Sequence, residues 1–269
     1  MAQCARSQCL RRLPDWLTTY GRMGMFIDRQ WFCSTRCVEE TVKARIKGLP
    51  PVEPAYVQGW RAMKLGSLLM QQVGLPREVI EAAAAGQEKL GIPIGRTLQD
   101  LGLVSADDVL RALATQAGVR YLTSVNPRVV SHSPGGLPRD VVKALRVVPV
   151  AADQKKREMQ VACVAPVPGL AVRALTRLTD WAVEPLLVAD DTMPHLVELY
   201  ATAGSPRGTD VGFVCDLLSG PARVAQFAKR RRWVRMAHER CDPYVWVRLD
   251  ADGATADLLM SMPEFERGY

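Results

Sequence analysis

The sequence predicts an α+β protein, and three observations lead to this class. Residues 64–116 carry one amphipathic helical pattern twice, residues 119–203 alternate short apolar strands with helices, and a cysteine-rich N-terminal region precedes both. Apolar residues at helical spacing indicate helices, whereas strict alternation indicates strands. In a chain of 269 residues, 48% of them hydrophobic, we expect four parts: an N-terminal zinc module (1–48), tandem helical hairpins (56–118), a small α/β layer (119–203) and a basic C-terminal lobe with a helix plus a β-hairpin (209–269).

Cysteines are concentrated near the N-terminus, where four of the seven occur as two close pairs: Cys4 with Cys9, and Cys33 with Cys37. In a reducing cytoplasm such pairs favour a tetrahedral zinc site over disulfides. Four thiolate ligands leave no open position for a catalytic water, so the site would be structural. A region this short buries little core, and Zn²⁺ would supply its folding free energy. The alternative is four free cysteines in a small basic tail.

The second cysteine pair resembles the Phe-Cys-Ser-x-x-Cys segment that leads into a helix in treble-clef and related zinc fingers. Here Ser34 would cap the helix and Cys37 would lie in its first turn. Residues 25–32 are expected to form a hairpin that turns at Asp28. Gly48 and the prolines after it should end the helix and begin a stiff linker.

Residues 64–87 and 93–116 share one order of signals. In each, a Leu-Gly or Ile-Gly dipeptide begins a short helix, a Gly-Leu ends it, and a longer helix finishes in glutamine. Pro76 suits a first helical position in one copy, and Ser105 with Asp108 resembles a capping box in the other. The two helical hairpins should pack side by side and bury Leu68, Leu69, Val79, Ile80, Leu98, Val109 and Leu113.

This repeat resembles the N-terminal domain of type II secretion and type IV pilus assembly ATPases, the GspE N-terminal domain. It is most similar to the MshEN version, which binds cyclic di-GMP through two tandem motifs of the same length and spacing. The resemblance implies ligand-binding residues at Lys64, Leu65, Gly66, Gln87, Ile94, Gly95, Arg96 and Gln116.

The two motifs depart from the family pattern, which begins Arg-Leu-Gly. The first copy begins with Lys64 and the second with Pro93, and Arg96 follows the glycine instead of preceding it. An arginine fork can hold a phosphate by two hydrogen bonds, whereas lysine offers a point charge and proline offers no donor. The alternative is therefore a helical core that has kept its shape and lost its ligand.

The pattern changes to short strands and helices after residue 119. We expect a short strand at 121–125, helices at 138–145, 170–178 and 194–202, and strands at 147–151, 159–165 and 183–188. This order resembles the small α/β layer that follows the helical hairpins in the GspE N-terminal family, so the resemblance covers about residues 64–203. A glycine-rich stretch at 131–136 is interpreted as a surface loop.

The last sixty residues lie outside this resemblance. Residues 220–234 are interpreted as a helix with Val224, Phe227 and Val234 inward and the bases at 229–232 outward. Residues 244–249 and 254–260 should pair as a hairpin. Its edge, with Tyr244 and Trp246, could receive an acidic protein partner; the alternative is that these aromatics complete the core.

The charge of the chain and the motifs that it lacks limit the possible functions. The net charge is +7, with bases concentrated in residues 1–50 and 229–235, and such runs are usually solvated faces but also suit acidic partners. The chain has no Gly-x-x-x-x-Gly-Lys-Ser/Thr loop, no Gly-x-Ser-x-Gly elbow and no His-Glu-x-x-His helix. We therefore expect a protein that is not an enzyme. Without a membrane span or a signal peptide, it is expected to be cytoplasmic.

The leading hypothesis is a non-catalytic adaptor or regulator with a GspE N-terminal-like domain, which docks to a protein partner of a secretion or pilus-type system. One alternative is a cyclic di-GMP effector with degenerate motifs. The other is a zinc-finger nucleic-acid-binding protein whose basic N-terminal region and residues 229–232 contact phosphates.

Overall fold

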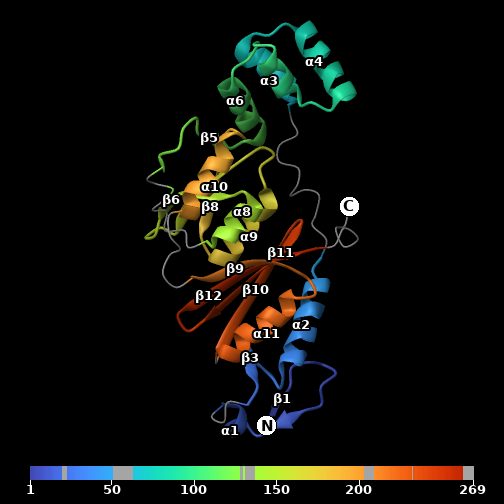
Figure 1. Ribbon diagram of the computed structural model, residues 1–269, viewed down its shortest axis with the longest axis vertical. Coiled ribbons are helices and arrows are strands. Elements are labelled where there is room, and N and C mark those ends of the chain that lie inside the picture. Colours follow the sequence, from blue (N-terminus) through green and yellow to red (C-terminus); the bar gives the residue numbers. More distant parts are fainter. Residues whose placement is uncertain are drawn as a thin grey trace.

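The computed structural model describes residues 1–19, 23–50, 63–127, 130, 137–202, 209–231 and 233–262. Helices occur together with sheets of two, six and four strands, which confirms the predicted α+β class. The parts follow one another along a long axis, with helices α3–α6 at one end and the N-terminal region at the other (Figure 1). In the described ranges, no helix is long and apolar enough to span a bilayer.

The N-terminal region is a strand pair, a short helix, a hairpin and a long helix. Ser34 caps the long helix by accepting a hydrogen bond from the backbone N–H of Cys37, as predicted, and the hairpin turns at Asp28 and Arg29. The elements are β1 (Ala2–Gln3), β2 (Arg12–Leu13), α1 (Asp15–Thr19), β3 (Met25–Ile27), β4 (Gln30–Phe32) and α2 (Thr35–Lys47).

The C-terminal region supplies most of a six-stranded sheet with the order β4-β3-β10-β11-β12-β9. Strand β3 runs parallel to β10, with Phe26 opposite Trp233 and Ile27 opposite Val234. The elements are β9 (Thr209–Asp216), α11 (Gly220–Arg230), β10 (Trp233–Cys241), β11 (Tyr244–Ala251) and β12 (Ala254–Ser261).

The two ends of the chain, placed by the sequence analysis in separate modules at 1–48 and 209–269, share this sheet and one hydrophobic core. Helices α2 and α11 lie side by side on one face (Figure 1) and bury Val38 and Val224 against Val247. The physical reason is that β3 and β4, only three residues each, need a neighbouring strand to bury their apolar side chains. We use the name terminal lobe for residues 1–50 with 209–262.

One expectation for the C-terminal region is wrong, and one of the two readings of its aromatic residues is excluded. The helix ends at Arg230, and Val234 belongs to strand β10, where exposed and buried side chains alternate from Trp233 to Met236. Strand β11 lies between β10 and β12 and is not an edge, so Trp246 is fully buried instead of facing a partner. The alternative given for this aromatic, a place in the core, is confirmed.

The repeat folds as two helix pairs with matching boundaries. Leu65 and Ile94 each begin the short first helix of a pair, and the capping box of Ser105 and Asp108 is present. Pro76 caps its helix and does not occupy the first helical position. The helices are α3 (Leu65–Val73), α4 (Arg77–Leu90), α5 (Ile94–Asp100) and α6 (Ala106–Ala117).

The predicted core of the helix pairs forms. Leu68, Leu69, Leu98 and Val109 are buried in one cluster. Val79, Ile80 and Leu113 are partly buried against them. This cluster is separate from the larger cores of the other parts.

The small α/β layer contains a sheet with the order β5-β8-β7-β6, in which β7 and β8 are parallel and joined through α9. The predicted order of its elements is confirmed. The elements are β5 (Arg120–Tyr121), α8 (Arg139–Leu145), β6 (Val148–Asp153), β7 (Glu158–Cys163), α9 (Gly169–Thr179), β8 (Ala182–Leu187) and α10 (Thr192–Thr202).

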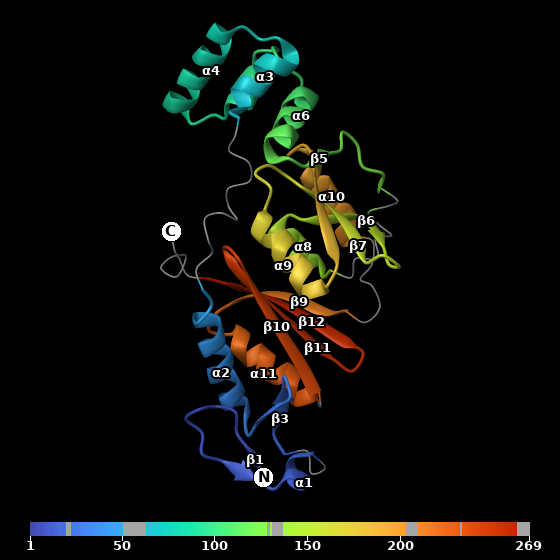
Figure 2. The ribbon, with the colours of Figure 1, turned by 180° about the vertical axis from the view of Figure 1, so that it is seen from behind.

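The α/β layer packs on the second face of the six-stranded sheet. Figure 2 shows α8 and α9 between the two sheets, and Leu175 of α9 shares a core with Trp246 and Leu259 of the terminal lobe. The chain therefore leaves the terminal lobe after α2 and returns to it at β9. The expected linker beyond residue 50, the loop at 131–136 and Arg232 lie outside the described residues.

Candidate metal centre and recognition surfaces

The first cysteine pair is held in a turn between β1 and β2. The backbone N–H of Cys4 donates to the carbonyl of Arg11 at 3.0 Å, and that of Cys9 donates to the carbonyl of Arg6 at 2.9 Å. The N–H of Ala5 donates to the carbonyl of Trp31 in β4 at 2.8 Å. These bonds fix the turn against the hairpin that carries the second pair.

The second pair comes from the junction between β4 and α2. Cys33 follows β4 directly, and Cys37 lies in the first turn of α2, where Ser34 caps the helix. The treble-clef-like segment thus has the geometry that the sequence indicated: a strand, a turn with one cysteine, and a helix with the other.

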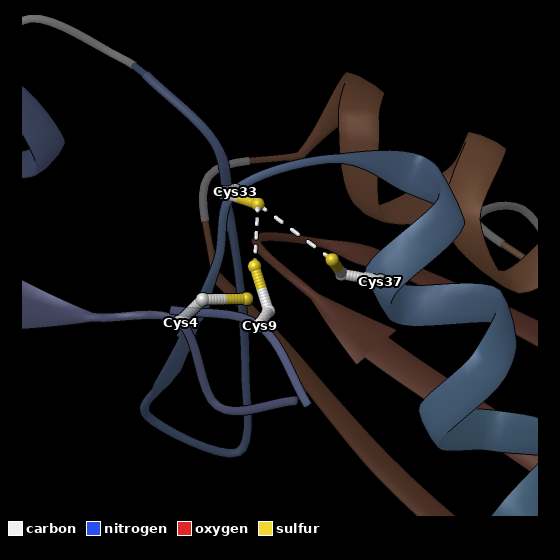
Figure 3. Close-up of side chains that lie close together, drawn as sticks. All are labelled: Cys4, Cys9, Cys33 and Cys37. Carbon is white, nitrogen blue, oxygen red and sulfur yellow. Dashed lines mark hydrogen bonds between the residues drawn. The ribbon is translucent and has the colours of Figure 1, made fainter. Parts of the chain in front are cut away.

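All four sulfur atoms converge. Each lies within 4.8 Å of the others, and Figure 3 shows the side chains pointing toward a common centre. The Sγ of Cys33 lies 3.6 Å from the Sγ atoms of both Cys9 and Cys37. Tetrahedral ligands about 2.3 Å from a zinc ion would be roughly 3.8 Å apart, whereas a disulfide requires about 2.0 Å. The cluster therefore fits a metal ion and contains no disulfide.

The environment of the thiols separates their pKa values. Burial raises the pKa of Cys33 to about 12, and hydrogen bonds with the neighbouring thiols act in the same direction. For Cys37, burial also acts upward, but hydrogen bonds from Ser34 and the other cysteines prevail and lower the pKa to about 7.

Two of the motif residues proposed for ligand binding, Gly66 and Gly95, lie where the two helices of each pair pack closely. A Cβ on Gly66 would lie 2.6 Å from Cγ2 of Ile80, and a Cβ on Gly95 would lie 2.9 Å from Cγ1 of Val109. Each glycine also faces the first residue of the opposite pair. The added Cβ on Gly66 would lie 3.7 Å from Cδ1 of Ile94, and the added Cβ on Gly95 would lie 3.7 Å from Cδ2 of Leu65. The glycines are explained by the close approach of helices.

The two motif-ending glutamines connect the pairs reciprocally. The side-chain oxygen of Gln87 accepts from the backbone N–H of Ile94 at 3.3 Å, and the side-chain nitrogen of Gln116 donates to the carbonyl of Met63 at 2.8 Å. Each glutamine thus binds the backbone at the start of the other motif. Their equivalent positions in the two copies were the sequence signal for this role, which sequence reasoning assigned to a ligand.

The charged motif residues point to solvent. Lys64 is exposed at the start of α3, and Arg96 forms an exposed ion pair with Asp100 at 3.0 Å. The structure thus brings Leu65, Gly66, Ile94 and Gly95 together, and leaves the two cations at the surface.

A cleft that sequence reasoning missed lies between the second helix pair and the α/β layer. It has a volume of about 710 Å³. Val109 and Leu113 line one side, and residues that follow the carboxyl ends of β7 and β8 line the other, including Val164 and Val188. Crevices at the carboxyl ends of parallel strands are common ligand or partner sites in α/β proteins. No local pattern indicates this cleft because its two sides are far apart in the sequence.

Comparison with known proteins finds a similarity to a pilus assembly ATPase. No family model matches the chain. Over 77 residues it is 42% identical to the type IV pilus assembly ATPase PilB of Thermus thermophilus, a match that spans 29% of this chain and 8% of PilB. The match to a pilus ATPase confirms the resemblance to the GspE N-terminal, MshEN-like domain.

Two solved structures match about half of the chain. The structure of MshE with cdg is 24% identical, with a TM-score of 0.42, and covers 51% of this chain and 99% of that one. The N-terminal domain of XpsE is 16% identical, with a TM-score of 0.35, and covers 52% of this chain and 98% of that one.

Proposed function

We propose that the chain is a non-catalytic adaptor whose GspE-type domain docks to a protein partner of a secretion or pilus-type machinery. The observation that carries this proposal is the 42% identity to a pilus ATPase over 77 residues, in a sequence that contains no phosphate-binding loop for ATP. In the resembling family, this domain connects the motor to a membrane-platform protein. Without a phosphate-binding loop, these residues would bind such a partner but would not hydrolyse ATP to move it.

The cleft beside the second helix pair suits the docking role. Leu101 and Leu103, in the turn between α5 and α6, are 63% and 39% exposed. They adjoin Asp100 and Val104 of the cleft, where apolar side chains lie among charged ones such as Asp190. An apolar centre with a polar rim is typical of protein interfaces.

Binding to the cytoplasmic part of the platform protein from the same host tests the docking role. The chain should bind it, and Leu101→Asp should weaken binding by about tenfold or more because it places a charge in a desolvated interface. Leu218→Asp is the matched control, since Leu218 is 80% exposed in the terminal lobe, and should leave affinity unchanged. Absence of binding, or equal losses in both variants, would refute docking at this cleft.

We further propose that Cys4, Cys9, Cys33 and Cys37 bind one structural Zn²⁺. Four sulfur ligands in a compact, partly buried cluster favour zinc, and all four coordination positions would be filled by protein. Metal analysis of freshly purified protein should give one equivalent of zinc per chain, and Cys33→Ser should lower it strongly. A content far below one equivalent in the unaltered chain would exclude this site.

Cyclic di-GMP binding is a second candidate function. In its favour, α3 and α5 begin beside each other with Lys64 and Arg96 exposed there, and MshE is known with cdg. Exposed cations beside the start of a helix attract phosphates. In calorimetry, Lys64→Ala should abolish most of any affinity while Lys89→Ala, on exposed α4, should not. An unchanged affinity in Lys64→Ala would remove this candidate.

A further inference from the structure

An aromatic pair lies on the six-stranded sheet near the N-terminal region. Phe26 of β3 and Trp233 of β10 are register partners, with ring centroids 4.1 Å apart and ring planes inclined by 33°. Trp233 is 40% exposed. Since Phe26 and Trp233 come from opposite ends of the chain, only the folded terminal lobe creates this pair.

A hollow adjoins each member of the pair. The smaller, about 310 Å³, is lined by Phe26, by Thr18 of α1, and by Lys229, Arg230 and Arg231 at the end of α11. The larger, about 780 Å³, is lined by Trp233, Arg29, Arg235 and the turn between β11 and β12. The aromatic pair therefore separates two solvent-accessible hollows, and each of them has basic side chains on its wall.

The fold thus unites two basic segments that are far apart in the sequence. Within the described part of the chain, Arg29, Lys229, Arg230 and Arg235 form no ion pair, and all four are exposed. Three carboxylates also line the larger hollow: Asp28 is engaged by Arg45 at 2.7 Å, Asp250 accepts from Thr255 at 3.0 Å, and Asp252 lies in the turn between β11 and β12. The cations are available for an anionic ligand.

The hairpin turn that presents Arg29 is rigidly held. Asp28 and Arg29 both have a left-handed backbone conformation, with φ of 51° and 63°. Residues other than glycine rarely adopt this conformation. The N–H of Asp28 donates to the carbonyl of Val234 at 2.9 Å, and its carboxylate accepts from the N–H of Met236 at 2.8 Å. Strained backbone that is fixed in this way is common at binding sites.

We propose that this surface binds single-stranded nucleic acid. Unpaired bases would stack on Trp233 and Phe26, and phosphates would contact Arg29, Arg235, Lys229 and Arg230. An exposed aromatic ring beside basic grooves is the feature that single strands require, and Trp233, which rests on the partly buried Phe26, provides one. Bases in a duplex are already stacked on each other. A lipid surface would instead need apolar side chains that protrude, but Trp233 is packed against Phe26 between two hollows.

Fluorescence anisotropy of the zinc-loaded full chain with labelled 12-residue oligo(dT) and oligo(rU), at about 50 mM salt, tests the proposal. Both oligonucleotides should bind, and their affinity for the protein should fall steeply as the salt concentration rises. Trp233→Leu should weaken binding by about 5- to 150-fold, the range for loss of one stacked base, while Trp233→Phe should retain most of it. Replacing Arg29 and Arg235 with serine should reduce the salt slope by roughly 1.4, since each phosphate contact in a single strand contributes about 0.7.

Matched controls separate this site from general charge and stickiness. Trp16→Leu removes another exposed tryptophan, 63% accessible and outside both hollows, and should leave binding unchanged. Replacing Lys155 and Lys156 with serine, in the exposed turn between β6 and β7, should do the same. Zinc content and thermal unfolding confirm that each variant is folded. The proposal is overturned by absent binding at low salt, by equal losses in the controls, or by Trp233-dependent binding to anionic vesicles without binding to single strands.

Discussion

Gly66 and Gly95 determine how closely the two helices within each pair approach. At Gly66 a new Cβ would clash with Ile80, and at Gly95 with Val109, at distances of 2.6 and 2.9 Å. Because these neighbours are branched core side chains, they can move only by disturbing the packing around them. The requirement for glycine is therefore local and steric.

The clash predicts the effect of substitution. Gly66→Ala should lower the free energy of unfolding by about 1–3 kcal/mol, the usual cost of overpacking a core. Gly86→Ala is the control, because Gly86 lies inside helix α4 with no heavy atom within 4 Å of its new Cβ, and it should stabilise by about 0.5–1 kcal/mol. Thermal unfolding followed by far-UV circular dichroism measures both. If Gly66→Ala unfolds at the same temperature as the unaltered chain, the packing role is wrong.

At the scale of elements, the hairpin of β3 and β4 connects the metal centre to the rest of the terminal lobe. One carboxylate at its turn, Asp28, binds both neighbours: the N–H of Met236 in β10 at 2.8 Å and the guanidinium of Arg45 in α2 at 2.7 Å. This residue therefore fixes the relative position of a strand and a helix.

Removing this connection should destabilise the lobe. Asp28→Ala leaves two donors without their acceptor and should cost about 1–3 kcal/mol. Asp28→Asn should lie between this variant and the unaltered chain, because asparagine keeps one acceptor and tolerates a left-handed backbone. Asp15→Ala removes an ion pair with the N-terminal amino group, in which the Asp15 side chain is 70% exposed. This change should alter the free energy of unfolding by less than about 1 kcal/mol. Denaturant unfolding measures the series, and equal effects of Asp28→Ala and Asp15→Ala would contradict the proposed role.

Local signals in the sequence predicted the individual helices and strands better than they predicted how these elements pack together. The helix boundaries at Leu65 and Ile94 and the four clustered cysteines follow from spacing and capping, which act over a few residues. The basic run at 229–232 looked like a continuing helix, yet the chain enters β10 at Trp233 because that strand pairs with β3. Such pairing depends on residues two hundred positions apart, and periodicity carries no information about it.

The candidate sites show the same division between local and long-range information. The cysteine ligands could be named from sequence, and the structure places them together. The cleft at α5 and α6 and the Phe26–Trp233 surface could not, because each is formed by segments that meet only in the folded chain.

At the scale of the whole molecule, the unit at 63–202, which resembles the GspE N-terminal domain, is inserted into the terminal lobe. Residues 1–50 and 209–262 form one sheet, with α2 and α11 on one face and the inserted α8 and α9 on the other. The chain thus combines a host lobe that carries the cysteine cluster with one inserted unit at 63–202. The predicted division of that unit into 56–118 and 119–203 stays a prediction.

This arrangement makes the metal centre important for both ends of the chain. The cysteine cluster fixes β3 and β4, and β3 is the neighbour of β10 in the central sheet. Loss of metal should therefore loosen C-terminal strands that contain no ligand, while the separate core of α3–α6 is unaffected.

Hydrogen exchange of the full chain, before and after removal of metal by a chelator, tests this account most directly. We predict that protection is lost in β3, β4, α2 and β10 together, and that it persists in α3–α6. Loss confined to residues 1–50, with β10 as protected as before, would contradict the claim that the two ends of the chain form one metal-stabilised lobe.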